Sequence, residues 1–400
     1  MVNILMTGLL SLSKELVNNM RRIILIYILF LFPLFTSDLY TQTKEEKRLT
    51  ILKNIYSCNF DSADFNISKY QISYPKEPQG LFLSVLSDWW KINIDRKNPS
   101  LDEKLEDKVN KTSDLCDEIL DKNPKDVDAL IYKGASLGYK GLTKSLRENW
   151  LSAADDGRQA LNLLDEALGL APGNKEAVLG IGIYNYFAEY IPERYPFLKP
   201  LMIIFPKGDK MKGVAQIKDA AENSKFAIYE AKYIIAYFNL QYERNFIESE
   251  IYCKKLFEEF PDNPVFEKML YNCYSGAGKF IEALDGWTII RDKYLKKVHG
   301  YEFEAVLREA DYYMSLSYLK TNRFEDMEQY INECESLSDK IDNDDTSFKV
   351  FTMLMQGMRN DAIGNRSKAV DYYKKVLDMK EYSGSQNEAN RYLKEPYFRK

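Results

Sequence analysis

The sequence predicts an all-α protein, a right-handed α-α superhelix in which about eight helical hairpins stack as a solenoid. Glycine and proline are sparse, at 19 and 13 residues in 400, whereas turn-rich β-sandwiches and barrels use more of both. Hydrophobic residues make up 45% of the chain, which is enough apolar surface for folding. A chain of this length also exceeds what one compact core supports, so an array of repeats with a continuous core is favoured.

Charge and reactive side chains restrict the possible functions. The 55 basic and 60 acidic residues give a net charge of −5, so we expect no nucleic-acid partner. The single histidine, His299, lies in a charged stretch and is predicted to be a plain surface residue, which argues against histidine triads and histidine zinc sites. The five cysteines are scattered and odd in number, so we expect buried free thiols. No metal site and no cofactor are predicted.

The first 42 residues are predicted to be a signal-peptide region. Met20 and two arginines precede an apolar stretch over 23–35, which is too short to cross a bilayer as a helix but suits a secretory signal. We expect translation to start at Met20 and the exported chain to be periplasmic or associated with a bacterial cell envelope. The bacterial setting is inferred from the signal type and from the Lys, Asn and Ile content. The alternative is an uncleaved N-terminal helix that anchors the chain.

A small residue recurs along the rest of the chain, four positions before a bulkier residue that suits helix packing. The shortest spacing, from Ser249 to Ala283, is 34 residues, and longer spacings indicate insertions into the same unit. Thr112 and Met327 stand where the pattern otherwise has a small residue. The eight positions are Ala63, Thr112, Ala160, Gly213, Ser249, Ala283, Met327 and Ala369.

These stretches resemble the tetratricopeptide repeat family, in an exported bacterial form, over residues 45–380. Gly134, Gly182 and Gly357 stand where the family has glycine in its first helix, and Ala160 and Ala369 stand in the second helix. Small residues there let two antiparallel helices cross closely, while the residue four positions later fills the space beside the contact. The family tryptophan is missing. We therefore expect the repeat solenoid over 43–382, followed by a polar cap over 383–400.

The resemblance implies a binding function, because the first helices of such hairpins line a wall that holds a peptide or a partner helix. We expect a non-catalytic scaffold or adaptor of the cell envelope with a protein or peptide partner. Lys268 and Asn272 match two of the five places of a clamp for chaperone C-terminal tails, too few to predict a cytoplasmic cochaperone. The predicted binding residues are Phe82, Trp89, Ile131, Leu179, Tyr186, Ile234, Phe238 and Tyr312.

One proline-rich insert, over 187–206, interrupts the repeat pattern. Its four prolines prevent a regular helix throughout, and we expect it to fold back over the apolar wall. The alternatives are membrane contact through 197–205 and docking of a partner. The insert also supports the competing function, a helical envelope hydrolase that uses a single glutamate, Glu189 or Glu193. The adjacent Trp89 and Trp90 could form a carbohydrate platform, but one core and one rim residue is the favoured interpretation.

Overall fold

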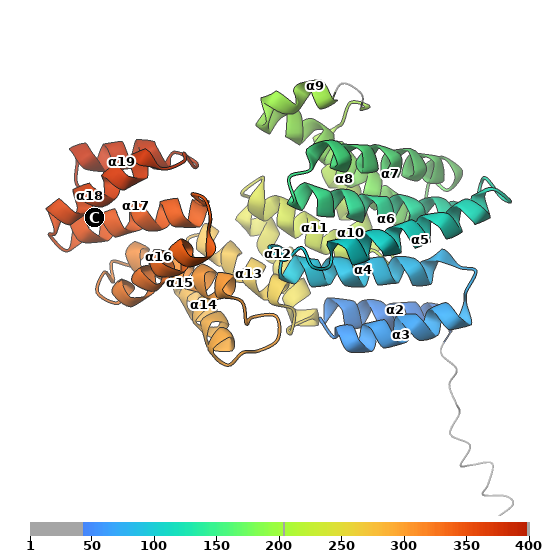
Figure 1. Ribbon diagram of the computed structural model, residues 1–400, viewed down its shortest axis with the longest axis horizontal. Coiled ribbons are helices and arrows are strands. Elements are labelled where there is room, and N and C mark those ends of the chain that lie inside the picture. The colour runs from blue at the N-terminus through green and yellow to red at the C-terminus, as the bar shows by residue number, and fades with distance from the viewer. Residues whose placement is uncertain (1–42, 203–204, 398–400) are drawn as a thin grey trace, which may run out of the picture. The chain divides into compact units, whose positions relative to one another are not determined.

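The computed structural model describes residues 43–202 and 205–397 (Figure 1), so the predicted signal region, 1–42, lies outside the described residues. The chain divides into two units, 1–47 and 48–400. In the first unit, Thr43 and Glu46 cap each other at the start of a helix, with the Glu46 amide donating to Thr43 Oγ1 at 3.2 Å. Within the described ranges the secondary structure is helical and includes no strand, which confirms the all-α prediction.

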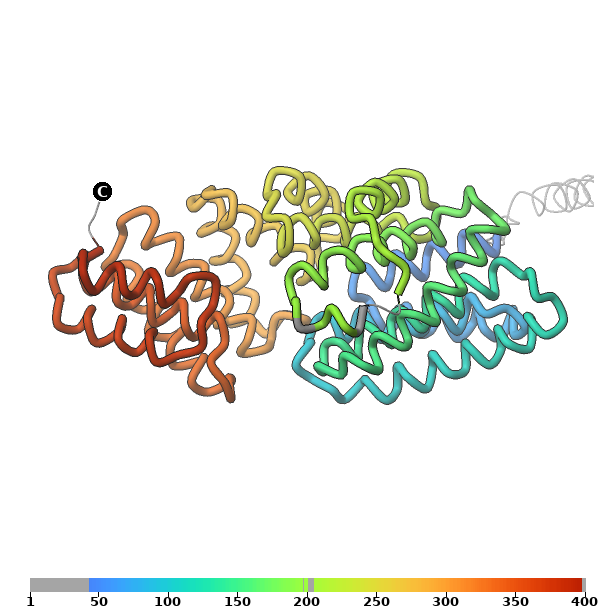
Figure 2. Tube along the Cα trace, turned by 90° about the horizontal axis from the view of Figure 1, so that it is seen from above, coloured from blue at the N-terminus to red at the C-terminus, as the bar shows by residue number. Residues whose placement is uncertain are grey.

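Among the described residues, α2, which begins four residues before the second unit, and the helices of that unit form eight consecutive hairpins. Figure 2 follows the course of the chain through them. Their first helices are α2 (Lys44–Tyr56), α4 (Pro78–Ile94), α6 (Val127–Leu146), α8 (Lys175–Arg194), α11 (Ile228–Gln241), α13 (Pro264–Gly276), α15 (Glu304–Lys320) and α17 (Ser347–Ala362). Their second helices are α3 (Phe60–Ser73), α5 (Asp102–Leu120), α7 (Trp150–Leu170), α10 (Lys210–Asn223), α12 (Phe246–Glu259), α14 (Phe280–Leu295), α16 (Met327–Ile341) and α18 (Arg366–Asp378). The insert holds η2 (Pro196–Leu198) and α9 (Lys199–Met202), and α19 (Ser385–Lys394) follows the last hairpin.

Aspartate and asparagine side chains begin many of these helices. Asp126 accepts a hydrogen bond from the Ala129 amide at 3.0 Å, and Asn174 accepts one from the Ala177 amide at 2.9 Å. These caps satisfy amide groups that have no partner within the helix. They explain why short polar segments separate the apolar helices at regular intervals.

The recurring small residues lie where two helices of a hairpin cross. All eight predicted positions are in second helices and are buried. A side-chain carbon added at Gly134 would lie 3.2 Å from the Ala160 carbonyl oxygen, and one added at Gly182 would lie 3.1 Å from that of Gly213. These distances confirm the predicted close crossing of the two helices in these two hairpins. Thr112 fits because its hydroxyl donates to the Lys108 carbonyl at 2.8 Å within its own helix.

Each hairpin packs against the next in chain order. Helix α13 contacts α4 and α11 as well as α15, and α19 packs on α17 and α18. Across the described residues, each helix is too short or too polar to span a bilayer. The surface formed by the first helices of the hairpins is therefore the candidate binding surface.

Candidate functional site

The first-helix face of hairpins one to six is filled by the protein's own aromatic side chains. Trp90 on α4 is fully buried. Its ring lies 5.2 Å from Tyr56 on α2, 5.1 Å from Tyr233 on α11 and 5.3 Å from Phe266 on α13, measured between centroids. These edge contacts are favourable for aromatic rings. Because they join hairpins that are distant in sequence, this face is a core rather than an open groove, and we term these four rings the Trp90 cluster.

A buried carboxylate lies at the centre of the Trp90 cluster. Glu230 Oε2 on α11 accepts hydrogen bonds from the Tyr56 hydroxyl at 2.9 Å and from the Trp90 indole nitrogen at 3.2 Å. Burial raises the pKa of Glu230 to about 7, although hydrogen bonds from Tyr56, Trp90 and Tyr139 favour the ionised form. The hydrogen bonds offset the cost of placing a carboxyl group in an apolar core. Glu230 therefore ties the first two hairpins to the fifth.

Further hydrogen bonds hold hairpins one and two against hairpins five and six. The Asn93 amide donates to the Tyr233 hydroxyl at 3.2 Å, and an Arg96 nitrogen donates to the same oxygen at 2.9 Å. The Asn263 amide, before α13, donates to the Tyr56 carbonyl at 2.8 Å. These hydrogen bonds thus join hairpin two to hairpin five and hairpin one to hairpin six.

The predicted binding residues of hairpins two to four lie mainly in packed regions. Trp89 is buried, with its ring 5.6 Å from Tyr139, and the half-buried Phe82 ring lies 5.2 Å from Tyr132. Ile131 and Leu179 are also buried. Since both Trp89 and Trp90 are core residues, the carbohydrate platform considered above is not formed.

The predicted residues Tyr186 and Phe238 stack on each other at 4.2 Å, and the half-buried Ile234 packs against the same core. The insert that follows Tyr186 does not replace these contacts. Its elements η2 and α9 pack on α8 and on each other, and α9 projects from this end of α8 (Figure 1). The start of the insert does cover part of the apolar wall, since the Phe187 ring lies 5.0 Å from Phe238 and 5.8 Å from Tyr242. The side chains of 201–204, in its apolar half, lie outside the described residues.

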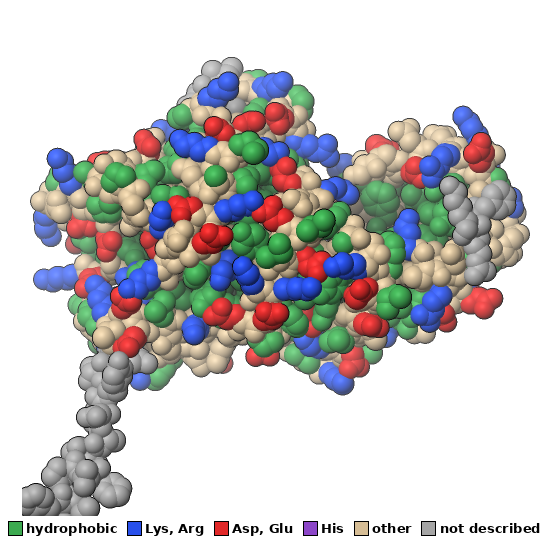
Figure 3. All heavy atoms as spheres, turned by 180° about the vertical axis from the view of Figure 1, so that it is seen from behind, with side chains coloured by type: hydrophobic (Ala, Val, Ile, Leu, Met, Phe, Trp, Pro, Cys, Tyr) green, Lys and Arg blue, Asp and Glu red, His purple; other side chains and the backbone are tan. Residues whose placement is uncertain are grey.

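An open groove remains beside the last two hairpins. It is a cavity of about 180 Å³ between α15, α17 and α19. Tyr312 is the only predicted binding residue in it. Figure 3 shows hydrophobic side chains gathered in a hollow at the C-terminal end of the molecule. The lining residues are Tyr312, Leu316, Leu319, Lys320, Phe351, Leu354, Met355, Met358, Glu388 and Tyr392, and we term this surface the C-terminal groove.

The C-terminal groove is apolar at its floor and carries one charge of each sign. Lys320 is exposed at the end of α15, and Glu388 on α19 pairs with Arg391 at 2.5 Å. The lysine and asparagine considered for a carboxylate clamp are engaged elsewhere, since Lys268 and Asn272 both reach Glu309, at 3.2 and 3.5 Å. The groove is therefore suited to an apolar ligand rather than to a phosphate chain or a free carboxylate.

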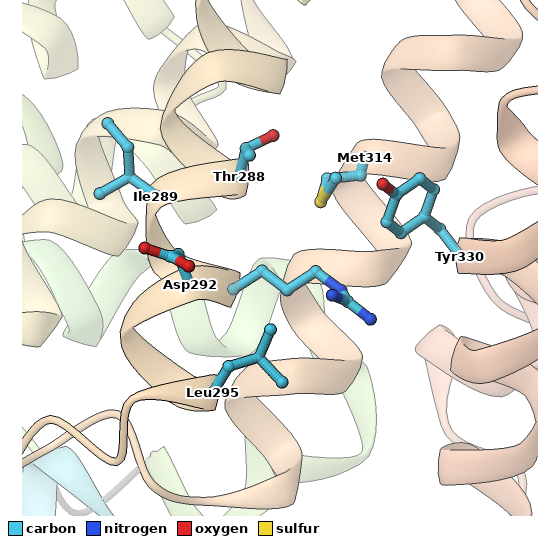
Figure 4. Close-up of a pocket in the computed structure, with 7 residues that line it drawn as sticks. Thr288, Ile289, Asp292, Leu295, Met314 and Tyr330 are labelled. Atoms are coloured by element: carbon cyan, nitrogen blue, oxygen red, sulfur yellow. The ribbon is translucent and has the colours of Figure 1, made fainter.

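A second cavity, of about 230 Å³, lies between α14, α15 and α16 (Figure 4). Arg291 extends into it but is neutralised, because it pairs with Asp311 at 2.9 Å and with Glu333 at 2.5 Å. Burial and the neighbouring Glu333 raise the pKa of Asp311 to about 7 despite Arg291. The Arg291 charge is therefore satisfied by two carboxylates of the protein, and Asp292 of the lining pairs with Lys296 at 2.5 Å. It is lined by Thr288, Ile289, Arg291, Asp292, Leu295, Met314 and Tyr330.

The residues considered for catalysis or metal binding are helix caps, exposed surface residues or buried thiols. Glu189 accepts a hydrogen bond from the Lys210 amide at 2.7 Å and so caps α10, while Glu193 is exposed. His299 is exposed and lies 3.5 Å from Glu302, which agrees with the prediction of a surface residue. All five cysteines are buried and free, as predicted. Among the described side chains, no group of three or more metal-ligating residues occurs.

Sequence reasoning missed two features. Glu230 is a lone acid within a very apolar helix, a pattern that could have indicated a buried carboxylate. Met355 and Met358 of the groove floor are spaced for one helix face. Tyr392 was expected only in a polar cap, but it reaches the groove from α19.

No family model and no curated protein matches this chain. Solved structures with a similar arrangement include a Rap protein complexed with competence and sporulation factor, at 11% identity and a TM-score of 0.47, covering 88% of this chain and 92% of that one. Yeast Tom70 has 15% identity and a TM-score of 0.37, with 88% and 75% covered. A human IFIT1 dimer with m7Gppp-AAAA has 12% identity and a TM-score of 0.41, with 88% and 81% covered.

Proposed function

We propose that this protein is a non-catalytic scaffold that binds a partner polypeptide through the C-terminal groove. The observation that carries the proposal is that the first-helix face is packed with side chains in the earlier hairpins but leaves a cavity at the C-terminal end. The first-helix faces of hairpins one, two, five and six meet in the Trp90 cluster, whereas α15, α17 and α19 leave an apolar cavity of about 180 Å³. Exposed apolar grooves of this kind mark sites of contact with other chains.

The lining of the groove supports an apolar segment as the ligand. Tyr312 and Phe351 offer aromatic surface, and Met355 and Met358 can adjust to side chains of different shape. Such surfaces bind amphipathic helices or extended peptides through a few anchoring side chains. The net charge of −5 and the single lysine in the lining weigh against nucleic acid.

Site-specific photocrosslinking in intact cells tests this function. A photoreactive residue at Leu316 lies in the C-terminal groove, whereas one at Ile281 on α14, which is 68% exposed, lies outside it. We expect Leu316 to crosslink one discrete partner and Ile281 to crosslink none. Equal crosslinking from both positions, or a Leu316 probe that reacts only with lipid or solvent, would contradict the proposal.

We further propose that the scaffold works in the bacterial cell envelope after export. The support is the sequence from Met20 to Phe35, with two arginines before a short apolar stretch. N-terminal sequencing of the fractionated protein tests this, and a chain that begins between residues 38 and 43 in the envelope or periplasmic fraction is expected. An intact Met1 in the cytoplasmic fraction would overturn the location but would leave the groove proposal untouched.

A further inference from the structure

Two buried cysteines meet where hairpin five packs on hairpin six. Cys253 lies on α12 and Cys273 on α13, and their sulfur atoms are 3.7 Å apart. Both side chains are fully buried. The Ser249 hydroxyl oxygen lies 3.0 Å from the Cys273 sulfur and donates to the Ala236 carbonyl at 2.8 Å. The two sulfurs therefore face each other in a small, defined space.

This pairing distinguishes the two residues from the other cysteines. All five are described and free, and only Cys253 and Cys273 have a sulfur–sulfur contact. Cys334 instead contacts the Thr352 hydroxyl at 3.2 Å. The cysteine count is odd, but the structure selects one pair that no spacing in the sequence indicates.

We propose that Cys253 and Cys273 form a disulfide when the folding chain meets an exchangeable disulfide, such as oxidised glutathione or the active-site disulfide of a thiol oxidase. The thiolate of one cysteine attacks the external disulfide, and a mixed disulfide forms as the first external thiolate leaves. The thiolate of the second cysteine then displaces the other external thiolate. The two cysteines are oxidised, the external disulfide is reduced to two thiols, and the two cysteine protons end on those thiols.

The geometry sets when this reaction occurs. A disulfide needs its sulfurs about 2.05 Å apart, so the pair must approach from 3.7 Å by side-chain rotation and a small shift of α12 towards α13. An external disulfide cannot reach fully buried sulfurs in the packed state. We therefore expect bond formation before the hairpins close, or during local opening, and slow reaction in the native state.

The disulfide would lie between the Trp90 cluster and the C-terminal groove. Helix α13 carries Phe266 of the Trp90 cluster and also contacts α15, which lines the C-terminal groove. A covalent link from α12 to α13 would therefore fix the junction between the filled face and the groove. This inference does not depend on what the groove binds.

Refolding of the reduced full-length chain in a glutathione redox buffer tests the proposal, with circular dichroism to verify helix recovery. The expected result is a fall from five free thiols to three and a disulfide-linked peptide pair, 245–254 with 269–279, after tryptic digestion. Incubation of the native reduced protein with oxidised glutathione in sub-denaturing urea gives a second route to the same measurement. The oxidised chain should unfold at a higher temperature, and dithiothreitol should reverse the shift.

Single substitutions provide the controls. Cys273→Ser should keep all four remaining thiols, whereas Cys334→Ser, at another buried cysteine, should still lose two. The proposal is overturned if the folded wild-type chain keeps five thiols in both experiments. It is also overturned if the linked peptides join any other pair of cysteines.

Discussion

The two ends of this protein use the same hairpin for different purposes. In the first six hairpins, α2 and α4 meet α11 and α13 through the Trp90 cluster, so the first-helix face becomes an interior. In the last two hairpins, α17 packs against α15 and α19, and a cavity remains between these three helices. Hairpins with the same helix crossing can therefore have different roles. Where other first helices pack on the first-helix face, that face becomes a core, and where they do not, it remains available for binding.

Truncation of the central indole should give the largest effect. Trp90→Ala removes a fully buried ring and leaves Glu230 with one hydrogen bond fewer, so we expect a loss of about 3–5 kcal/mol in the free energy of unfolding. Trp150→Ala, at a tryptophan that is 48% exposed, should cost less than about 1 kcal/mol. Urea denaturation measures both, and equal losses would show that the first six hairpins are not closed by this cluster.

The acid at the centre of the cluster predicts a pH dependence. The pKa of Glu230 is raised from 4.5 to about 7, so its protonated form favours the folded state. The stabilisation should be complete below pH 4.5 and should disappear as the pH rises through 7. A shift of this size corresponds to roughly 3 kcal/mol.

The measurement is the difference in unfolding free energy between wild type and Glu230→Gln at pH 5 and at pH 8. The wild type should lose stability relative to the variant as the pH rises, because glutamine cannot ionise. Glu282→Gln, at an exposed glutamate of α14, should show no such change. A difference that is constant with pH would contradict the buried position of the carboxyl group.

Substitutions at two glycines test whether the helices of the last hairpin, beneath the C-terminal groove, cross as closely as those of the earlier hairpins. A side-chain carbon at Gly357 on α17 would lie 2.3 Å from the buried Tyr373 ring, while one at Gly138 on α6 would meet nothing within 4 Å. Gly357→Ala should therefore destabilise the protein by roughly 1–3 kcal/mol, and Gly138→Ala should stabilise it by roughly 0.5–1 kcal/mol. Thermal unfolding distinguishes the signs, and a tolerated Gly357→Ala would indicate loose packing at the C-terminal end.

The smallest effect on stability is expected in the C-terminal groove itself. Leu316→Asp places a charge on the half-buried lining, so it should change the free energy of unfolding by less than about 1 kcal/mol. Its affinity for the partner found by crosslinking should fall at least tenfold, about 1.4 kcal/mol. Ile281→Asp on α14 should leave binding unchanged. An unaltered affinity of Leu316→Asp would remove the groove from the binding surface.

The local part of the fold was readable from the sequence. The eight recurring positions predicted eight second helices, and the small residues at Gly134, Gly182 and Gly357 predicted close crossings. Thr112 and Met327 departed from the pattern without breaking it, because one satisfies its hydroxyl within its helix and the other is fully buried in the same place. These contacts join neighbouring helices, so a periodic sequence is sufficient to encode them.

Only the tertiary structure decided which stretch of the first-helix face stays open. The hydrogen bond from Trp90 to Glu230 spans 140 residues, and that from Asn263 to Tyr56 spans 207. Whether such residues meet depends on small rotations between successive hairpins, which add up along the stack. The sequence of a single repeat does not indicate the total rotation. For this reason most of the predicted wall residues became core, while Tyr312, at an equivalent position in a later hairpin, lines the groove.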